Sequence, residues 1–321
     1  MIFDSVARRR ATLLALVTVG ALGATAARSA SARTPPVASR TGSAAPRVTL
    51  TPTRPVRGRL FTVTVSGLPS PTLDSLGTAV AATVAGEPLH FARAAGGRVS
   101  ALAAIPIDAP DTLSLAVVVS AGGRADTTLV PVAVAAGNYK VVEVAPAKRE
   151  QLTVAPEFGR EPDSALAARI ARENAQARDI GVRSHGTPRL WRAPFVLPRP
   201  GRVTSGFGTA RTFNGAVQTR HMGVDFAGAV GAPIRVANRG VVALVADFYL
   251  AGRAVYVDHG GGLVTGYFHM SKPLVAAGDT VRRGQVIGRV GHTGRVTGPH
   301  LHWVMRYGAI TVDPRSGMTV R

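Results

Sequence analysis

The sequence predicts a mainly β protein with two domains joined by a short helical connector. Short runs of alternating apolar residues recur between glycine and proline turn signals over residues 47–136. Helical periodicity is clear in one stretch only, from Pro162 to Arg178. From Arg202 onward the chain is again strand-like and dense in glycine. A length of 321 residues leaves room for a leader beside two modest domains.

The N-terminus has the pattern of an export signal. Three arginines at 8–10 precede an uncharged, mostly apolar run over 11–27, and residues 30–32 (Ala-Ser-Ala) resemble a cleavage site. We therefore interpret residues 1–32 as a signal peptide and residues 33–46 as a flexible linker. The alternative is an uncleaved membrane anchor, because the uncharged run is near the lower length for spanning. Without an anchor we expect no stable membrane insertion and an exported protein in the periplasm or cell envelope.

Residues 47–136 predict an immunoglobulin-like β-sandwich. Strand-like runs at 60–65, 78–84 and 112–119 are separated by glycine and proline turns at the spacing of small sandwiches. The segment holds a single histidine, His90, which we expect at the surface or an edge. A positioning or binding module is the resulting interpretation.

Residues 137–194 are expected to connect the two domains. The stretch 139–156 reads as a further strand pair, and Pro162 with Asp163 marks the start of the helix that follows. An extended, proline-rich segment comes next, in which His185 is expected to be solvated. Residues 195–321 then form the second domain, with strands at 241–246, 254–257 and 263–268 and a hairpin over 278–288.

The charge balance narrows the possible partners. The chain has 38 basic and 18 acidic residues, a net charge of +20, and such a protein is drawn to polyanions. We exclude nucleic acid because aromatic residues make up 5% and no helix-turn-helix or RNP-like pattern is present. Cysteine is absent, so a metal site must use nitrogen and oxygen ligands.

Five side chains near the C-terminus carry the chemistry. They are His221 and Asp225 in an H-x-x-x-D spacing, His269, and His300 and His302 in an H-x-H spacing. On a strand, both histidines of H-x-H point to one face. Catalytic zinc commonly takes three protein ligands and keeps one open position, at which water becomes a nucleophile near neutral pH. The pattern therefore predicts a zinc hydrolase.

The proton-transfer group is predicted to be histidine. Many zinc peptidases use a glutamate, but residues 201–321 contain none, and histidine titrates near neutral pH. Three ligands from five candidates leave two histidines for proton transfer and oxyanion stabilisation. Spacing alone does not say which two. His259, at the end of a predicted strand, is expected to be structural.

Several motifs together resemble the lysostaphin/LytM-type zinc metalloendopeptidases, which have a duplicated-hybrid-motif fold. They are Ser205-Gly206-Phe207-Gly208, the segment around His221, Asp258-His259-Gly260, Tyr267-Phe268-His269 and, most specifically, the run from Gly291 to His302. The resemblance covers about residues 195–316. It implies an antiparallel β-barrel-like domain with a cleft along one face. Phe268 departs from the family, where a small residue often precedes this histidine.

The resemblance also implies roles for the five residues. His221, Asp225 and His302 would bind Zn2+. His269 and His300 would form the catalytic pair, in which one takes the proton from the zinc-activated water and both can hydrogen-bond the oxyanion. The implied substrate is a peptide bond in peptidoglycan stems or cross-links.

Two alternatives stay open beside this interpretation. One is a non-catalytic or latent wall-binding regulator of other hydrolases, with latency if the 137–200 connector covers the site. The other is an endopeptidase for glycine-rich or other protein substrates, a choice that the loops over 209–220 and 247–253 would decide. The bond cleaved and the oligomeric state are not predicted by the sequence.

Overall fold

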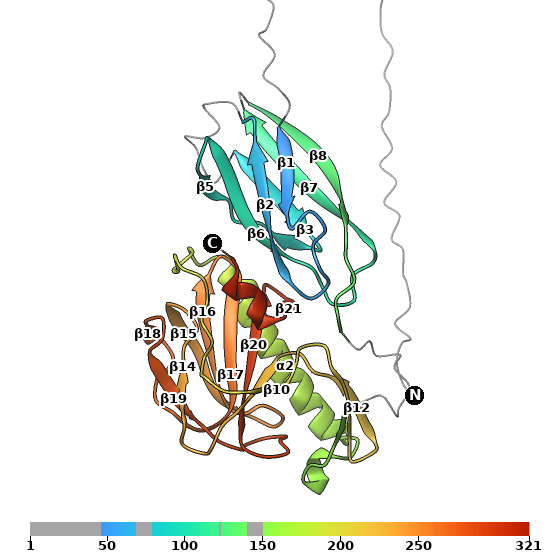
Figure 1. The fold of residues 1–321 in the computed structure, drawn as a ribbon, viewed down its shortest axis with the longest axis vertical. Coiled ribbons are helices and arrows are strands. Elements are labelled where there is room, and N and C mark those ends of the chain that lie inside the picture. Colours follow the sequence, from blue (N-terminus) through green and yellow to red (C-terminus); the bar gives the residue numbers. More distant parts are fainter. Residues whose placement is uncertain (1–45, 69–78, 122, 140–149, 321) are drawn as a thin grey trace, which may run out of the picture. The chain divides into compact units, whose positions relative to one another are not determined.

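The computed structural model describes residues 46–68, 79–121, 123–139 and 150–320. The expected signal peptide, and all but the last residue of the expected linker, lie outside the described residues. The described residues belong to one compact unit that is mainly β, as predicted, with a single α-helix in that part of the chain (Figure 1). No helix among them is long and apolar enough to cross a membrane.

The region expected to be a sandwich folds into two four-stranded antiparallel sheets. The first has the order β1-β2-β6-β5 and the second β4-β3-β7-β8. Their strands are β1 (Arg47–Thr51), β2 (Leu60–Ser66), β3 (Val80–Val84), β4 (Glu87–Pro88), β5 (Ala92–Ala94), β6 (Arg98–Ala104), β7 (Thr112–Ala121) and β8 (Arg124–Ala133). Alternate residues of β2 and β7, such as Val63 and Val117, are buried in one shared core. The immunoglobulin-like assignment stays a prediction.

Helix α2 (Ser164–Ser184) begins where the sequence places it. The Asp163 side chain caps the helix by accepting a hydrogen bond of 2.8 Å from the Leu166 backbone N–H. The helix continues beyond the predicted end at Arg178, because Ile180 is buried with Tyr256 and Val264 in a small cluster on the large sheet. Tertiary packing thus extends the helix past its sequence signals.

The C-terminal region is built on a ten-stranded sheet whose main order is β10-β13-β20-β17-β16-β15-β18, with β14, β19 and β21 paired at its side. Its strands are β10 (Val203–Ser205), β13 (Val224–Ala227), β14 (Pro233–Arg235), β15 (Gly240–Phe248), β16 (Gly252–Gly260), β17 (Leu263–Pro273), β18 (Thr280–Val281), β19 (Val286–Val290), β20 (His300–Tyr307) and β21 (Ile310–Val312). The pairing does not close on itself, so the expected barrel-like closure is absent from the described strands.

Two local expectations need correction. The predicted hairpin over 278–288 is not a strand pair, since β18 pairs with β15 whereas β19 pairs with β14 and β17. The strand pair expected over 139–156 lies mostly outside the described residues, and its visible part, β9 (Glu150–Leu152), pairs in parallel with β11 (Ala210–Phe213). A third strand, β12 (Val217–Arg220), completes this small sheet. Turn signals are local, whereas pairing partners depend on packing.

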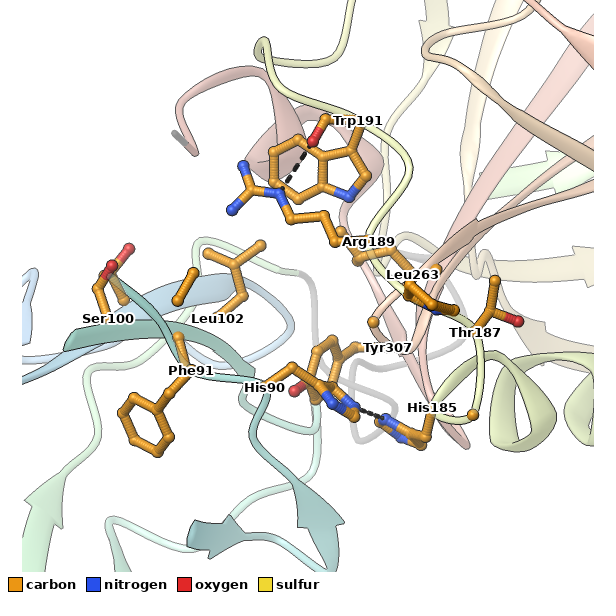
Figure 2. A pocket seen from close by; sticks show the side chains of 17 residues that line it. His90, Phe91, Ser100, Leu102, His185, Thr187, Arg189, Trp191, Leu263 and Tyr307 are labelled. Carbon is orange, nitrogen blue, oxygen red and sulfur yellow. Dashed lines mark hydrogen bonds between the residues drawn. The ribbon is translucent and has the colours of Figure 1, made fainter. Parts of the chain in front are cut away.

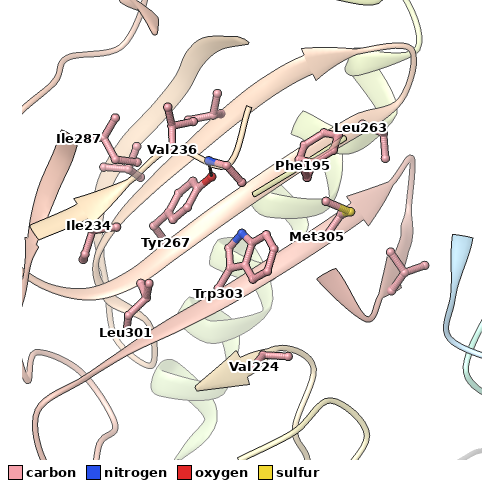
Figure 3. Packing of buried hydrophobic residues seen from close by; sticks show 14 of the residues in the cluster. Phe195, Val224, Ile234, Val236, Leu263, Tyr267, Ile287, Leu301, Trp303 and Met305 are labelled. Carbon is pink, nitrogen blue, oxygen red and sulfur yellow. Dashed lines mark hydrogen bonds between the residues drawn. The ribbon is translucent and has the colours of Figure 1, made fainter. Parts of the chain in front are cut away.

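The core of the large sheet lies beneath the candidate site. Tyr267 on β17 and Trp303 and Met305 on the neighbouring β20 are fully buried, and Phe195 packs beside them (Figure 3). The Tyr267 hydroxyl is satisfied inside this core, because the Ala237 N–H donates to it over 2.8 Å. A rigid, close-packed layer therefore supports the strands that carry the site.

His185 is not solvated, contrary to the prediction. Its Nε2 lies 2.8 Å from a Glu87 carboxylate oxygen and its Nδ1 lies 2.8 Å from Nε2 of His90 (Figure 2). A cavity of about 340 Å3 lies beside these side chains. On its opposite side the Arg189 guanidinium stacks 3.5 Å from the Trp191 ring centroid. His185 directly follows the end of helix α2 at Ser184. Its contacts with Glu87 and His90 come from segments that are distant from it in the sequence.

Candidate metal centre and cleft

Strand β20 presents both histidines of the H-x-H motif to one face. Leu301 and Trp303 are fully buried in the core, so the alternation of the strand turns His300 and His302 to the opposite side. This confirms the one-face expectation. Strand β13 pairs antiparallel with β20 and places Asp225 directly opposite His302.

His221 reaches the same point from the segment that follows β12. Its Nδ1 donates a hydrogen bond of 2.8 Å to the Gly206 carbonyl, which leaves Nε2 directed at Asp225 and His302. Gly223 makes this approach possible. A Cβ added there would lie 2.6 Å from both Cε1 of His302 and the Trp303 carbonyl oxygen, closer than real contacts allow.

Three donor atoms converge at this point. Nε2 of His221 lies 2.8 Å from Nδ1 of His302 and 3.1 Å from Oδ1 of Asp225, and the remaining pair is 2.7 Å apart. The three residues form a group able to hold a metal ion. Two imidazole nitrogens and one carboxylate oxygen are a ligand set that zinc accepts, and the open cleft leaves room for a further ligand. The residues present therefore fit a zinc ion.

The electrostatics of the three groups agree with a ligand set. Burial opposes ionisation of Asp225, yet the charges and hydrogen bonds of His221 and His302 hold its pKa well below the usual value. Burial also lowers the pKa of His302 to about 4, although its hydrogen bond to Asp225 acts in the opposite direction. At neutral pH the site thus presents an ionised carboxylate and a neutral His302 imidazole, the forms that bind metals.

Arg211 fixes the outer oxygen of Asp225, and sequence reasoning missed it. Its guanidinium donates to Asp225 Oδ2 over 2.6 Å and to a carboxylate oxygen of Glu150 over 3.1 Å. The same Glu150 oxygen accepts a hydrogen bond of 3.0 Å from the Ser205 hydroxyl. No local pattern marks Arg211 or Glu150, because the parallel pairing of β9 with β11 brings them together from 61 positions apart.

His269 faces the cleft only because strand β17 is bulged. Between the pairs Val255↔Tyr267 and Arg253↔Met270, β17 spans one residue more than β16. The extra residue is accommodated by a left-handed backbone at His269, with φ of 60°. Tyr267 and Met270 both remain in the core, while Phe268 and His269 turn to the cleft side.

The two remaining histidines are held in matching ways. Nδ1 of His269 donates to the Thr293 carbonyl over 2.8 Å, and Nδ1 of His300 donates to the Gly298 carbonyl over 2.8 Å. Both Nε2 atoms are thereby left to the cleft. The ring centroids are 4.8 Å apart, and Nε2 of His300 lies 3.7 Å from Oδ1 of Asp225. Burial, and next the charge of His300, hold the His269 pKa well below 6.5.

Phe268, the residue that departs from the resemblance, packs against the site. Its ring stacks on His302 at 5.3 Å with an interplanar angle of 29°, and contacts Tyr256 behind it. His259 is fully buried between the Arg239 carbonyl and the Thr265 hydroxyl, as expected of a structural residue.

Two hollows flank the candidate site. One, of about 240 Å3, is walled by Ile170, Glu173 and Asn174 of helix α2 and by residues of the 209–220 and 247–253 stretches. The other, of about 330 Å3, contains Glu150, Asp225 and His300. The connector predicted as a separate segment therefore supplies side chains to both hollows.

Comparison with known proteins finds a family whose model matches the part of the chain that holds the five candidate residues. Residues 219–314 match the family described as Peptidase family M23. The chain is 40% identical over 116 residues to the peptidoglycan DD-endopeptidase ShyC of Vibrio cholerae, and 48% identical over 83 residues to ShyA of the same organism. These matches cover 36% and 26% of this chain and 27% and 19% of those proteins, so the chain spans about a quarter of their length or less.

The structural likeness extends further along the chain. A crystal structure of a Pseudomonas aeruginosa protein assigned to peptidase M23 superposes with a TM-score of 0.60 and 28% identity. The superposition covers 83% of this chain and 95% of that chain, so it includes much more than residues 219–314.

Proposed function

Because residues 219–314 form a domain of peptidase family M23, we propose that this chain is an exported zinc-dependent endopeptidase that hydrolyses peptide bonds in peptidoglycan stems or cross-links. The observation that carries the proposal is the geometry of five residues. Three donor atoms lie within 2.7 to 3.1 Å of one another, and two further histidines direct Nε2 into the same cleft.

In this proposal His221, Asp225 and His302 hold the zinc ion. Bound zinc supplies a Lewis acid that polarises a carbonyl and a water whose pKa is lowered toward neutrality. Arg211 keeps Asp225 oriented by holding its outer oxygen, and the Gly206 carbonyl fixes the ring of His221. Such outer contacts set ligand orientation and basicity.

His269 and His300 are proposed as the catalytic pair. The Thr293 and Gly298 carbonyls hold each Nδ1 as the protonated nitrogen, so each neutral ring has a free lone pair on Nε2. One Nε2 takes the proton from the attacking water and returns it to the leaving amine. Once protonated, an Nε2–H can donate to the oxyanion that develops on the attacked carbonyl.

The peptidoglycan substrate is inferred from the relatives and from charge. Both Vibrio cholerae relatives are named peptidoglycan DD-endopeptidases. A net charge of +20 favours residence beside an anionic cell wall. The wall-binding regulator remains the competing function, and it differs in one measurable respect, since it needs no catalytic pair.

The test uses the purified protein beside three variants. Zinc content is measured by elemental analysis, and soluble fragments released from purified peptidoglycan sacculi are quantified. We expect one zinc per chain and fragment release from the unmodified protein. His302→Ala should lose both, His269→Ala should keep zinc and lose release, and the exposed His292→Ala should keep both.

The outcomes separate the alternatives. Zinc without release from the unmodified protein would indicate a latent enzyme or another protein substrate. Release that persists in His269→Ala would contradict the proposed catalytic pair. Neither zinc nor release would favour the regulatory function.

A further inference from the structure

An arginine at the junction of the two hollows has no charged partner among the residues that the structure describes. Four residues line both hollows, namely Arg211, Phe213, His269 and Arg295. His269 belongs to the candidate catalytic pair and Arg211 is used in holding Asp225. Arg295 has no role in the metal centre described above, although it lies two residues after Thr293, whose carbonyl orients His269.

The carboxylates that line the two hollows are already paired. Glu150 and Asp225 are both held by Arg211, at 3.1 and 2.6 Å. The Glu173 carboxylate accepts a hydrogen bond of 2.7 Å from Arg169 and one of 2.9 Å from the Tyr249 N–H. Among the described residues, no hydrogen bond or ion pair reaches the guanidinium of Arg295. It is therefore a partly buried cation beside a candidate catalytic histidine, with its hydrogen-bonding capacity unused.

The side chain is nevertheless held in place. Its guanidinium lies 4.1 Å from the centroid of the buried Phe213 ring, and its backbone N–H donates to the Leu250 carbonyl over 2.9 Å. The preceding Gly294 packs so tightly on the Leu250–Gly252 turn that a Cβ would approach the Gly252 nitrogen to 2.4 Å. A guanidinium that stacks on an aromatic ring through one of its faces keeps the N–H groups at its edge free for a ligand.

We propose that Arg295 is a specificity-determining residue that binds a carboxylate of the substrate peptide beside the scissile bond. The inference rests on the proposed endopeptidase function and names a substrate class within it. Planar guanidinium and carboxylate groups pair through two parallel hydrogen bonds, which a lysine cannot reproduce. The carboxylate has two possible sources, a free main-chain terminus or a side chain of the peptide.

The test compares four proteins on three peptides. The proteins are the unmodified chain, Arg295→Gln, Arg295→Lys and the control Arg282→Gln, which removes an exposed positive charge outside both hollows. The peptides are a synthetic cross-linked stem peptide with free carboxylates, the same peptide amidated at its C-terminus, and one amidated at its side-chain carboxylate. The measured quantities are kcat/KM, zinc content and, in the His300→Ala background, the Kd of the uncleaved peptide.

We expect Arg295→Gln to lower kcat/KM on the free peptide by about ten- to a hundredfold, the value of a charge-assisted hydrogen bond. Zinc content and the Arg282→Gln control should not change. Arg295→Lys should recover part of the loss. One of the two amidated peptides should be cleaved equally by the unmodified protein and Arg295→Gln, and that peptide identifies the carboxylate.

An equal loss on all three peptides would overturn the inference, because a structural role predicts that result. No loss on any peptide would overturn it as well. If the unmodified protein cleaves none of them, the endopeptidase proposal fails on these substrates. In that case the Kd of the peptide with free carboxylates tests the inference about Arg295. An unchanged Kd in Arg295→Gln would still count against carboxylate binding.

Discussion

The Arg211 guanidinium binds only one of the two carboxylate oxygens of Asp225. Arg211 occupies Oδ2 at 2.6 Å, and Oδ1 is left to face His221 and His302 at 3.1 and 2.7 Å. One oxygen is thereby committed to structure and the other is available as a ligand. Glu150 accepts a hydrogen bond from Nε of the same guanidinium, and it lies on β9, which precedes the residues that match the family.

Removal of this clamp should weaken metal binding. We expect Arg211→Gln to lower zinc affinity by about ten- to a hundredfold, because an unheld Asp225 presents its oxygens in several orientations. The measurement is a competitive zinc titration against a chromogenic chelator. Arg235→Gln serves as the control, since this exposed arginine lies on β14 away from the cleft. Equal zinc affinities in Arg211→Gln and Arg235→Gln would show that zinc binding by Asp225 does not depend on its contact with Arg211.

The closeness of Gly223 to His302 gives a second prediction. Gly223→Ala should reduce zinc binding and destabilise the fold by about 1–3 kcal/mol, since the added Cβ would overlap the His302 ring and the Trp303 carbonyl. Thermal unfolding and zinc titration measure the two effects. Gly186→Ala provides the matched control, because a Cβ there would lie 3.4 Å from the Arg183 carbonyl oxygen, an ordinary contact, and the φ of Gly186 is not positive. Similar behaviour of both variants would contradict the steric argument.

His259 predicts an acid dependence of stability. Burial is the main reason that its folded pKa is lowered to about 4 from 6.5. The unfolded chain therefore binds this proton more readily between these two values, so stability is full above about pH 6.5 and falls as pH drops toward 4. The loss from this one group amounts to roughly 3 kcal/mol at pH 4.

Urea unfolding at pH 7, 6, 5 and 4 measures this dependence. The variant His259→Gln should show a shallower slope with pH, whatever its absolute stability, whereas the exposed His292→Ala should keep the slope of the unmodified protein. His269 and His302 also have lowered pKa values and add to the slope in all three proteins. Identical slopes would show that His259 is not the titrating group.

Much of the site was accessible to sequence reasoning because its signals are local. The H-x-H alternation on β20 needs only the two-residue period of a strand, and the register of Asp225 with His302 follows once β13 and β20 pair. The helix start at Asp163 was equally readable, since a capping side chain contacts a backbone N–H three residues on.

Other features depended on contacts that no local pattern encodes. The sequence predicts a solvated His185 in a proline-rich segment, yet Glu87 and His90 contact it from almost a hundred positions away. Helix α2 extends beyond its predicted end because Ile180 packs in a buried cluster with Tyr256. Strands β18 and β19 paired elsewhere because sheet neighbours compete with the adjacent strand for backbone hydrogen bonds.

By itself, the sequence determined the ligand types and the strand period of this protein, because both are properties of neighbouring residues. The tertiary structure alone decided that His269 faces the cleft, since strict alternation would send it into the core with Tyr267. A bulge and a left-handed backbone at His269 reverse that direction. Likewise, only the tertiary structure shows that each described carboxylate lining the two hollows is paired with an arginine other than Arg295, because charge pairing depends on distance in space.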